Sequence, residues 1–322
     1  GNSTNSSNSG YFGPDRFKWR DINSGTVFTI SQSTDTPDGF AFSYHADCTT
    51  ADASFGGNEF ISIQHKFEGQ NLQDFAKGTS SAKQYTLSFH VKSDVTGTYV
   101  VAFQDTDNNR MCCATYTVSS ADTWEKKTIT IPADTTGAFN NDANESLMIS
   151  WCLGSGTDYT SGTLQTVWGA DVSANTFVGQ TANVGSSTDN DFRLTGVQLE
   201  VGSVATDFEH RSFADEERLC KRYFKRFTKA THGQTPFIGH LTSGVGIIGY
   251  VFSEVMRDTP SISQSNNFNI YTASTNNVKT DLNIEAAPQG FRTLIQSMTG
   301  TNGHACQIDF ENDTLLDFSA EL

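Results

Sequence analysis

Residues 84–93 have the sequence QYTLSFHVKS, and this stretch indicates the fold class of the region around it. Its apolar residues fall on alternate positions, and these are Tyr85, Leu87, Phe89 and Val91. In a β-strand alternate residues point to the same face, so one face would be buried and the polar one exposed. A half-buried strand of this kind is typical of an antiparallel sheet.

Further period-two segments lie on both sides of this strand and are separated by turn residues. They are TVFTIS (26–31), FAFSYHA (40–46), EFISIQHKF (59–67), TYVVAFQD (98–105), CCATYTV (112–118), WEKKTITIP (124–132), SLMISWCLG (146–154) and FRLTGVQLEVG (192–202). A short helix is expected at residues 71–78, and long loops between residues 160 and 188. Many short strands with almost no helix predict an all-β protein, an antiparallel jelly-roll β-sandwich.

The sequence pattern changes at Ser212. Residues 212–227, SFADEERLCKRYFKRF, have the spacing of a helix, with Ser212 as N-cap and Asp215 as its capping partner. Residues 1–10 have the composition of a linker or of the start of a fragment. The predicted organisation is a jelly roll over residues 11–211, a connecting helix over 212–229 and a second small β domain over 230–322.

Charge and hydropathy exclude several classes of protein. The chain of 322 residues has a formal net charge of -15, which disfavours binding to nucleic acid. No stretch approaches the roughly 20 apolar residues that cross a bilayer, so membrane insertion is not expected. The 6 cysteines have no CxxC pair. We interpret them as free buried thiols of a protein made in a reducing cytosol; three disulfides are the alternative.

The junction at residues 194–224, LTGVQLEVGSVATDFEHRSFADEERLCKRYF, resembles one found in many bacteriophage tail-fibre and virion-appendage proteins. In that family a last jelly-roll strand leads into a helix that ends Leu-Cys-x-Arg-Tyr-Tyr/Phe. Upstream, PDRFKWR (14–20) and segments 67–93 and 122–137 match the same family in order and spacing. Residues 254–262, EVMRDTPSI, are similar to the Met-Arg-x-Thr-Pro strand common in the C-terminal domains of these proteins. The chain departs from the family pattern at Phe17, where Trp is common, at Lys221, where Gln is usual, and in lacking the usual opening strand.

The resemblance implies a jelly roll like that of carbohydrate-binding modules and a place on a bacteriophage virion assembled in the host cytoplasm. We expect a tail fibre or receptor-binding appendage without enzymatic activity that contacts host surface polysaccharide and other virion proteins. A capsid-anchored head fibre or decoration protein is the alternative, and a glycan depolymerase is a third, weaker one. No GxSxG, P-loop or HExxH motif supports catalysis.

Sugar binding requires exposed aromatic rings, because the CH faces of sugars stack on them. The weakly patterned loop region contains Trp168 and Tyr159, and the strand at 112–118 contains Tyr116. These three residues are the predicted glycan-binding positions, with core packing as the competing interpretation. Trp19, Trp124 and Trp151 are predicted to belong to the core.

A structural calcium ion is the one cofactor considered. Hard oxygen ligands suit Ca²⁺, and Asp15, Asp189 and Asp191 flank the first and last predicted strands. An acidic turn in which Asp and Asn bind their own backbone is the alternative and is preferred. No other cofactor is expected.

The predicted helix has an apolar stripe that includes Leu219, Tyr223 and Phe227. The stripe either packs beneath its own jelly roll or lies on a symmetry axis, since fibres of the resembled family are commonly homotrimers. Its basic residues are Lys221, Arg222, Lys225, Arg226 and Lys229. They form either a solvated face or a contact with acidic domains of neighbouring copies.

Overall fold

A computed structural model of the chain describes residues 9–14, 16–228, 237–265, 267–272, 276–298, 302–310 and 314–322. The chain divides into two compact units, one of Gly1–His210 with Leu322 and one of Arg211–Glu321. Among the described residues, no helix has the length and hydrophobicity needed to cross a bilayer.

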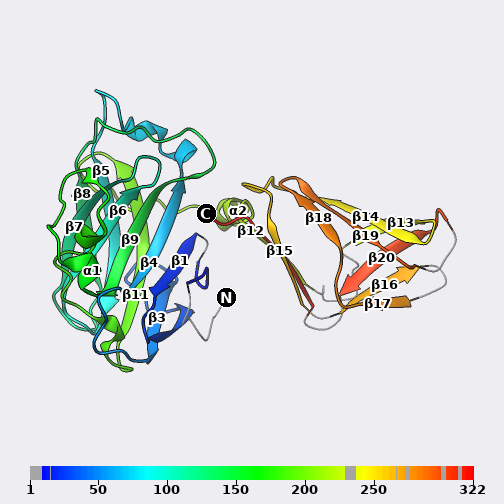
Figure 1. Ribbon diagram of the computed structural model, residues 1–322, viewed down its shortest axis with the longest axis horizontal. Helices are drawn as coiled ribbons and strands as arrows, with labels where there is room; N and C mark the ends of the chain where they lie inside the picture. Colours follow the sequence, from blue (N-terminus) through cyan, green and yellow to red (C-terminus); the bar gives the residue numbers. More distant parts are fainter. Residues whose placement is uncertain are drawn as a thin grey trace. The chain divides into compact units, whose positions relative to one another are not determined.

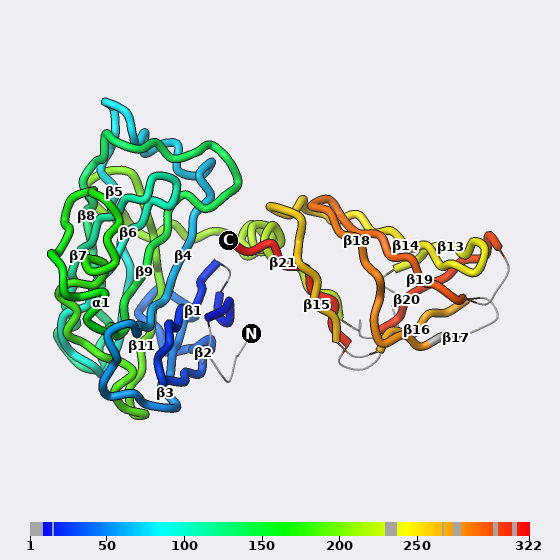
Figure 2. Tube along the Cα trace, in the orientation of Figure 1, coloured from blue at the N-terminus to red at the C-terminus, as the bar shows by residue number. Residues whose placement is uncertain are grey.

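Unit 1 is a sandwich of two antiparallel sheets (Figure 1). Sheet A contains, in spatial order, β2 (Val27–Ser33), β3 (Ser43–Thr50), β11 (Asp191–Val201), β5 (Tyr85–Ser93) and β8 (Glu125–Ile131). Sheet B contains β1 (Phe17–Ile22), β4 (Phe60–Glu68), β9 (Glu145–Ser155), β6 (Gly97–Asp105), β7 (Arg110–Val118) and β10 (Gly169–Ala170). The chain crosses repeatedly between the sheets, as the tube in Figure 2 shows. The predicted jelly-roll fold is confirmed.

The core of unit 1 lies between the two sheets and follows the predicted alternation. Tyr85, Leu87, Phe89 and Val91 of β5 are fully buried. Trp19 and Trp151 of sheet B are also fully buried, as predicted. Each such side chain contributes roughly 1.5–3 kcal/mol by leaving water, so many together can stabilise a sandwich without cross-links. The 6 cysteines, all within the described residues, form no disulfide, and all except the half-buried Cys220 are buried.

One of two predicted local features of unit 1 is wrong. The short helix at residues 71–78 is instead a pair of 3-10 turns, Gly69–Asn71 and Gln73–Phe75, which end at Ala76 in the left-handed region. Residues 160–188 are mostly loop, as expected. Beyond the end of α1 (Thr157–Thr160) they contain the two-residue strand β10 and two 3-10 turns, Ser173–Asn175 and Val184–Ser186.

Unit 2 is a second β structure with its own core. Sheet C contains β12 (Phe224–Thr228), β21 (Leu315–Ser319) and β15 (Ser261–Ser265). Sheet D contains β17 (Asn276–Lys279), β16 (Phe268–Thr272), β20 (Ala305–Phe310), β13 (Phe237–Thr242), β14 (Val245–Val251), β19 (Gly290–Ile295) and β18 (Ile284–Ala287). The core is rich in phenylalanine, with Phe237, Phe268, Phe310 and Phe318 almost completely buried.

The helix predicted over residues 212–229 is too long. Helix α2 spans Phe213–Cys220, begins at the predicted N-cap Ser212, whose hydroxyl accepts from the Asp215 N–H, and is followed by strand β12. Burial alternates along β12, where Lys225 is buried, Arg226 exposed and Phe227 half-buried. Because β12 pairs with β21, tertiary pairing overrides the helical spacing.

Candidate functional site

The outer face of sheet B is closed by the chain itself. Residues 157–184 cross it and form a small second apolar cluster around Val100, Met111 and Phe177. The Cys113 N–H donates to the Gln165 carbonyl at 2.6 Å, and the Phe177 N–H donates to the Tyr159 carbonyl at 2.9 Å. This face therefore offers no open strand surface along these residues.

The outer face of sheet A carries a row of polar side chains across four neighbouring strands. The row contains Ser31, His45, Arg193 and Lys92, which are register partners in that order. Because alternate residues of these strands fill the core, these residues must point outward. A continuous row of half-buried polar side chains on the outer face of the sheet provides hydrogen-bonding groups for a ligand that lies across the strands.

Asp35, in the loop between β2 and β3, fixes one end of this row. Its carboxylate accepts from the Lys92 Nζ at 2.8 Å and from the Trp124 Nε1 at 3.0 Å. The hydrogen bond from Lys92, followed by that from Trp124, lowers the pKa of Asp35. The carboxylate is therefore ionised near neutral pH and holds both partners in place.

Trp124 was predicted to be a core residue, but the structure leaves it half-buried just before β8. Its indole N–H is used by Asp35, so the ring is held in one orientation beside the polar row. The sequence signal that could have found it is its position at the start of an edge strand. A side chain at the edge of a sheet has a neighbouring strand on one side only, so it is less enclosed than one at the centre.

An aromatic hollow of about 330 Å³ lies farther along the same face. Phe40 contacts three rings, with centroid distances of 5.2 Å to His90, 5.1 Å to Phe208 and 5.4 Å to His210. The hollow is lined by Asp38, Gly39, Phe40, Ser88, His90, Lys126, Gly196, Asp207, Phe208 and His210. Burial, followed by the charge of Lys126, lowers the pKa of His90, so this imidazole is neutral at neutral pH.

Gly196 makes the close approach of these rings possible. It lies at a bulge in β11, with φ at +60°, and a Cβ there would come within 2.6 Å of the Phe40 ring and 3.0 Å of His90 Nδ1. Glycine adopts this left-handed conformation without steric cost. Any larger residue would push Phe40 or His90 out of place.

The wall of the hollow is formed by residues 203–210, which turn back along sheet A after β11. The Thr206 Oγ1 donates to Glu200 at 2.8 Å, and the Glu209 N–H donates to Gln198 Oε1 at 2.9 Å. Burial raises the pKa of Glu200, but hydrogen bonds from Gln198 and Thr206 outweigh it and lower the pKa overall. These contacts bring Asp207, Phe208 and His210 to the hollow.

Two of the three predicted glycan-binding aromatic residues are wrong. Trp168 is 8% exposed and Tyr116 is 7% exposed, so a sugar ring cannot stack on either of them. The Trp168 Nε1 donates to the Pro132 carbonyl, and Tyr116 stacks on Tyr99. Tyr159 is half-buried and packs against Phe60 and Phe177 on the closed face, so its role in glycan binding stays a prediction.

The described members of the predicted calcium set do not fit a calcium ion. The Asp191 carboxylate is 2.6 Å from Arg193 Nη1 and 3.4 Å from His45 Nε2, and the cationic Arg193 would repel Ca²⁺. Asp189 is exposed, and Asp15 lies outside the described residues. Within the described ranges, no group of three or more His, Cys, Asp or Glu residues is arranged to hold a metal ion.

The residues of the predicted oligomer helix do not share a helix. Leu219 lies in α2, Tyr223 follows it and is buried, and Phe227 lies in β12 against the core of unit 2. The predicted basic helix face is likewise divided between the turn and β12, and Lys229 lies outside the described residues. A trimer axis built on these three residues is therefore wrong, while the number of copies stays a prediction.

No protein-family model matches the sequence, and no curated protein does. Three solved structures are similar to part of this chain. The enzymatically active domain of tailspike protein 4 of bacteriophage CBA120 aligns with 58% of this chain at 7% identity and a TM-score of 0.32, and this chain spans 19% of that one. The family 11 carbohydrate-binding module of a Clostridium thermocellum cellulosomal cellulase aligns with 63% of this chain and 97% of its own, at 9% identity and a TM-score of 0.31.

The CBM22-2 xylan-binding domain of Paenibacillus barcinonensis Xyn10C aligns with 57% of this chain and 91% of its own, at 12% identity and a TM-score of 0.30. At these identities the likeness concerns architecture alone. What these proteins bind or cleave is a property of those proteins, and a function for this chain has to be argued from its own residues.

Proposed function

We propose that the chain is a carbohydrate-binding protein without enzymatic activity and that it binds glycan on the outer face of sheet A. The observation that supports this is the fixed Trp124 ring beside a polar row whose side chains already hold one another in place. A sugar ring can stack its CH face on the indole while its hydroxyls bind the row. Because these side chains are already ordered, binding costs little side-chain entropy.

The electrostatics of this face favour binding over hydrolysis. A glycosidase needs a carboxyl group whose pKa is raised so that it can donate a proton. Here Lys92 and Trp124 lower the pKa of Asp35. For Asp191 burial raises the pKa, but His45 and Arg193 outweigh burial and lower it overall. Two carboxylates that stay ionised in ion pairs suit the orientation of a ligand better than acid catalysis.

We further propose that the protein is a bacteriophage tail fibre or receptor-binding appendage, on the strength of the sequence motifs between residues 67 and 224. Several copies on one virion, as in a homotrimer, would convert weak sites into strong attachment to host surface polysaccharide. A head fibre or decoration protein on the capsid is the second candidate. Electron microscopy of virions labelled with an antibody to this chain separates the two positions.

Affinity electrophoresis of the full chain in gels containing host polysaccharides tests the site. Trp124→Ala should weaken glycan binding at least tenfold, which corresponds to about 1.4 kcal/mol. Trp124→Phe keeps a ring but removes the donor to Asp35, so it separates stacking from positioning. Tyr159→Ala, a matched truncation on the closed face of sheet B, tests the competing sequence prediction for that residue, and a site on sheet A predicts unchanged binding.

The opposite pattern, with binding lost in the Tyr159 variant and retained in the Trp124 variant, would place the glycan site on sheet B and contradict a site on sheet A. An absence of retardation by every host polysaccharide would remove the glycan-binding proposal altogether. The chain length of the polysaccharide after incubation is measured in parallel, and shortening would contradict the non-enzymatic role.

A further inference from the structure

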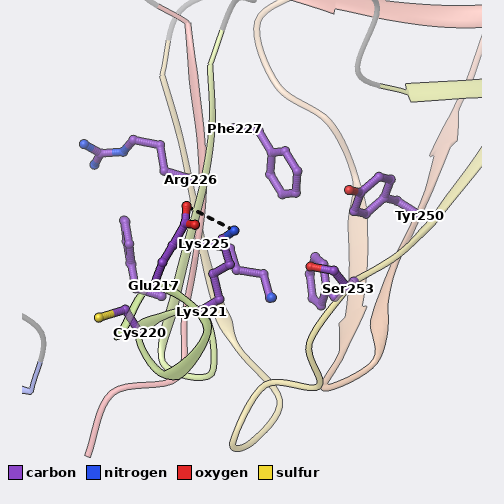
Figure 3. Close-up of a pocket in the computed structure, with 10 residues that line it drawn as sticks. Glu217, Cys220, Lys221, Lys225, Arg226, Phe227, Tyr250 and Ser253 are labelled. Atoms are coloured by element: carbon purple, nitrogen blue, oxygen red, sulfur yellow. Dashed lines mark ion pairs between the residues drawn. The ribbon is translucent and has the colours of Figure 1, made fainter. Parts of the chain in front are cut away.

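A second hollow, of about 370 Å³, lies within unit 2 beside the end of α2 (Figure 3). It is lined by Glu217, Cys220, Lys221, Phe224, Lys225, Arg226, Phe227, Tyr250, Phe252 and Ser253. These residues come from α2, from β12 and from the end of β14 with the turn that follows it. The hollow has one basic side and one aromatic side, so it offers two different kinds of contact.

The Lys225 side chain supplies the basic side. It is only 7% exposed, and its Nζ lies 3.5 Å from Glu254 Oε2 and 5.1 Å from the centre of the Phe252 ring. A charge-assisted bond between an ammonium and a carboxylate is usually about 2.7–2.9 Å long. The same Oε2 also accepts a hydrogen bond from the Ser253 hydroxyl, so this oxygen is shared between Ser253 and Lys225.

The Lys225 ammonium makes fewer hydrogen bonds and ion pairs than a charge with so little exposure usually has. An ammonium carries three donors, and the long contact with Glu254 engages at most one of them. Burial lowers the pKa of Lys225, and the nearby Glu254 only partly opposes that effect. In Figure 3 Lys225 points toward Ser253, inside the hollow, whereas Arg226 points away from it.

The other two cations of the lining are already paired. Arg226 donates to both carboxylate oxygens of Asp317, at 2.7 Å and 2.6 Å. Lys221 lies 3.2 Å from Glu217. Lys225 is therefore the cation of this lining whose charge a ligand can best complete.

The aromatic side is built by Phe227, Tyr250 and Phe252. The Phe227 and Tyr250 rings are 5.3 Å apart, and both are half-buried. Phe227 also contacts Phe237 and Phe318 in the core, which fixes its position. Such rings form a rigid apolar wall against which a flat or ring-shaped molecule can pack.

We propose that this hollow binds a carboxylate carried on a six-membered ring with an apolar face. The carboxylate would accept from Lys225, and the ring would pack against Phe227 and Tyr250. A uronic-acid sugar and an aromatic acid share this chemistry. The site lies in unit 2 and does not depend on the glycan face proposed for sheet A.

Titrations of the full chain, labelled with ¹³C in its Phe and Tyr rings, test the site with D-glucuronate, benzoate and D-glucose. Glucuronate or benzoate should shift the Phe227 and Tyr250 resonances, and glucose, which lacks the carboxylate, should bind at least tenfold more weakly. Lys225→Met should weaken the binding of glucuronate and benzoate at least tenfold. Arg292→Met, which removes a 57% exposed cation elsewhere in unit 2, should leave their binding unchanged.

A second variant keeps the test valid if Lys225→Met does not fold. Ser253→Asp places a carboxylate next to the Lys225 ammonium from an exposed position, and it should block the added anion without disturbing the core. Equal binding of glucose and glucuronate would overturn the proposal. So would full binding in both the Lys225 and Ser253 variants, or no shift of these resonances with either carboxylate. Whether glucuronate or benzoate binds more tightly distinguishes a sugar site from a site for aromatic acids.

Discussion

Lys77 gives the sharpest test of what stabilises unit 1. Its ammonium is fully buried and donates to Asp105 Oδ2 at 2.5 Å, to the Gly137 carbonyl at 2.7 Å and to the Thr136 carbonyl at 3.1 Å. It also lies 3.1 Å from Asp134 Oδ2 and 4.9 Å from the centre of the Trp168 ring. The ammonium thus occupies a ready-made cation site formed by oxygen atoms and aromatic faces.

Lys77→Met keeps most of the side-chain volume but leaves the buried carboxylates without this cation. Asp134 retains Arg110, at 2.8 Å and 3.0 Å, whereas the buried Asp105 keeps only uncharged donors, the N–H and Nδ2 of Asn108, among the described residues. Most of the loss should therefore fall on Asp105. Removing one partner of a buried ion pair costs about 3–5 kcal/mol, and we expect a loss in that range.

The assay is urea denaturation followed by tryptophan fluorescence. All 4 tryptophans, Trp19, Trp124, Trp151 and Trp168, lie in unit 1, so the signal reports that unit alone. Lys83→Met, at an exposed position, should change stability by less than about 0.5 kcal/mol. Adding Asp105→Asn to Lys77→Met should recover part of the loss, since the unpaired charge is then removed.

The reasoning would be refuted if Lys77→Met cost less than about 1 kcal/mol, which is the size of an ordinary hydrogen bond. It would also be refuted if the double variant lost the sum of the two single losses. Either result would mean that the burial of Lys77 against Trp168 and Phe139, rather than charge pairing, stabilises this region.

Three further predictions concern pH, backbone strain and thiol reactivity. Burial raises the pKa of Asp21 to about 6, so its contribution to stability is present below the unfolded value of 3.8 and is lost as pH rises through 6. Asp21→Asn should therefore stabilise unit 1 by roughly 1–3 kcal/mol at pH 8 and by almost nothing at pH 4. The same difference in urea midpoint between the variant and the native protein at both pH values would contradict this. Gly196→Ala should displace Phe40 and shift the His90 resonances. Gly202→Ala, at a positive φ with no atom within 4 Å of the added Cβ, should lower stability through the backbone alone, and identical spectra for the two variants would argue against the steric account. In the native protein Ellman's reagent should modify Cys220 first, because the other thiols are buried. Burial raises their pKa, for Cys48 to about 11 and for Cys112 to about 12. Rapid release of more than one equivalent of the coloured thiolate per chain would contradict this.

The strands of unit 1 could be predicted because each carries its own signal. Alternate apolar residues must leave water, and β5 buries the four residues that its pattern selects. The helix over 212–229 was wrong because Tyr223 and Phe227 are four residues apart and satisfy a helical stripe as well as a strand. Only the pairing of β12 with β21 decides between the two, and that partner lies about 90 residues away in the sequence.

The prediction of Trp168 and Tyr116 as glycan-binding residues was wrong for a related reason. A loop with weak periodicity was expected to expose Trp168, yet residues 157–184 form a covering layer on sheet B, and Trp168 packs on the buried Lys77. Sequence alone cannot tell a covering loop from an exposed one, because both lack a strand pattern. Exposure depends instead on whether the sheet beneath presents apolar or polar residues outward.

The polarity of the outward side chains can be read for each strand, and it indicates sheet A as the sheet whose outer face needs no covering layer. The outward positions of β6, β7 and β9 include Val100, Ala102, Met111, Cys113 and Cys152, which are apolar and need a cover. The outward positions of β5 are Thr86, Ser88, His90 and Lys92, which are polar. Thr86 and Ser88 are nevertheless buried, whereas His90 and Lys92 stay half-buried. The same ten residues that indicate the fold, QYTLSFHVKS, therefore also contribute to the proposed glycan face. A sandwich strand that is polar on its outer side, next to others of the same kind, marks where a ligand rather than another layer of protein can lie.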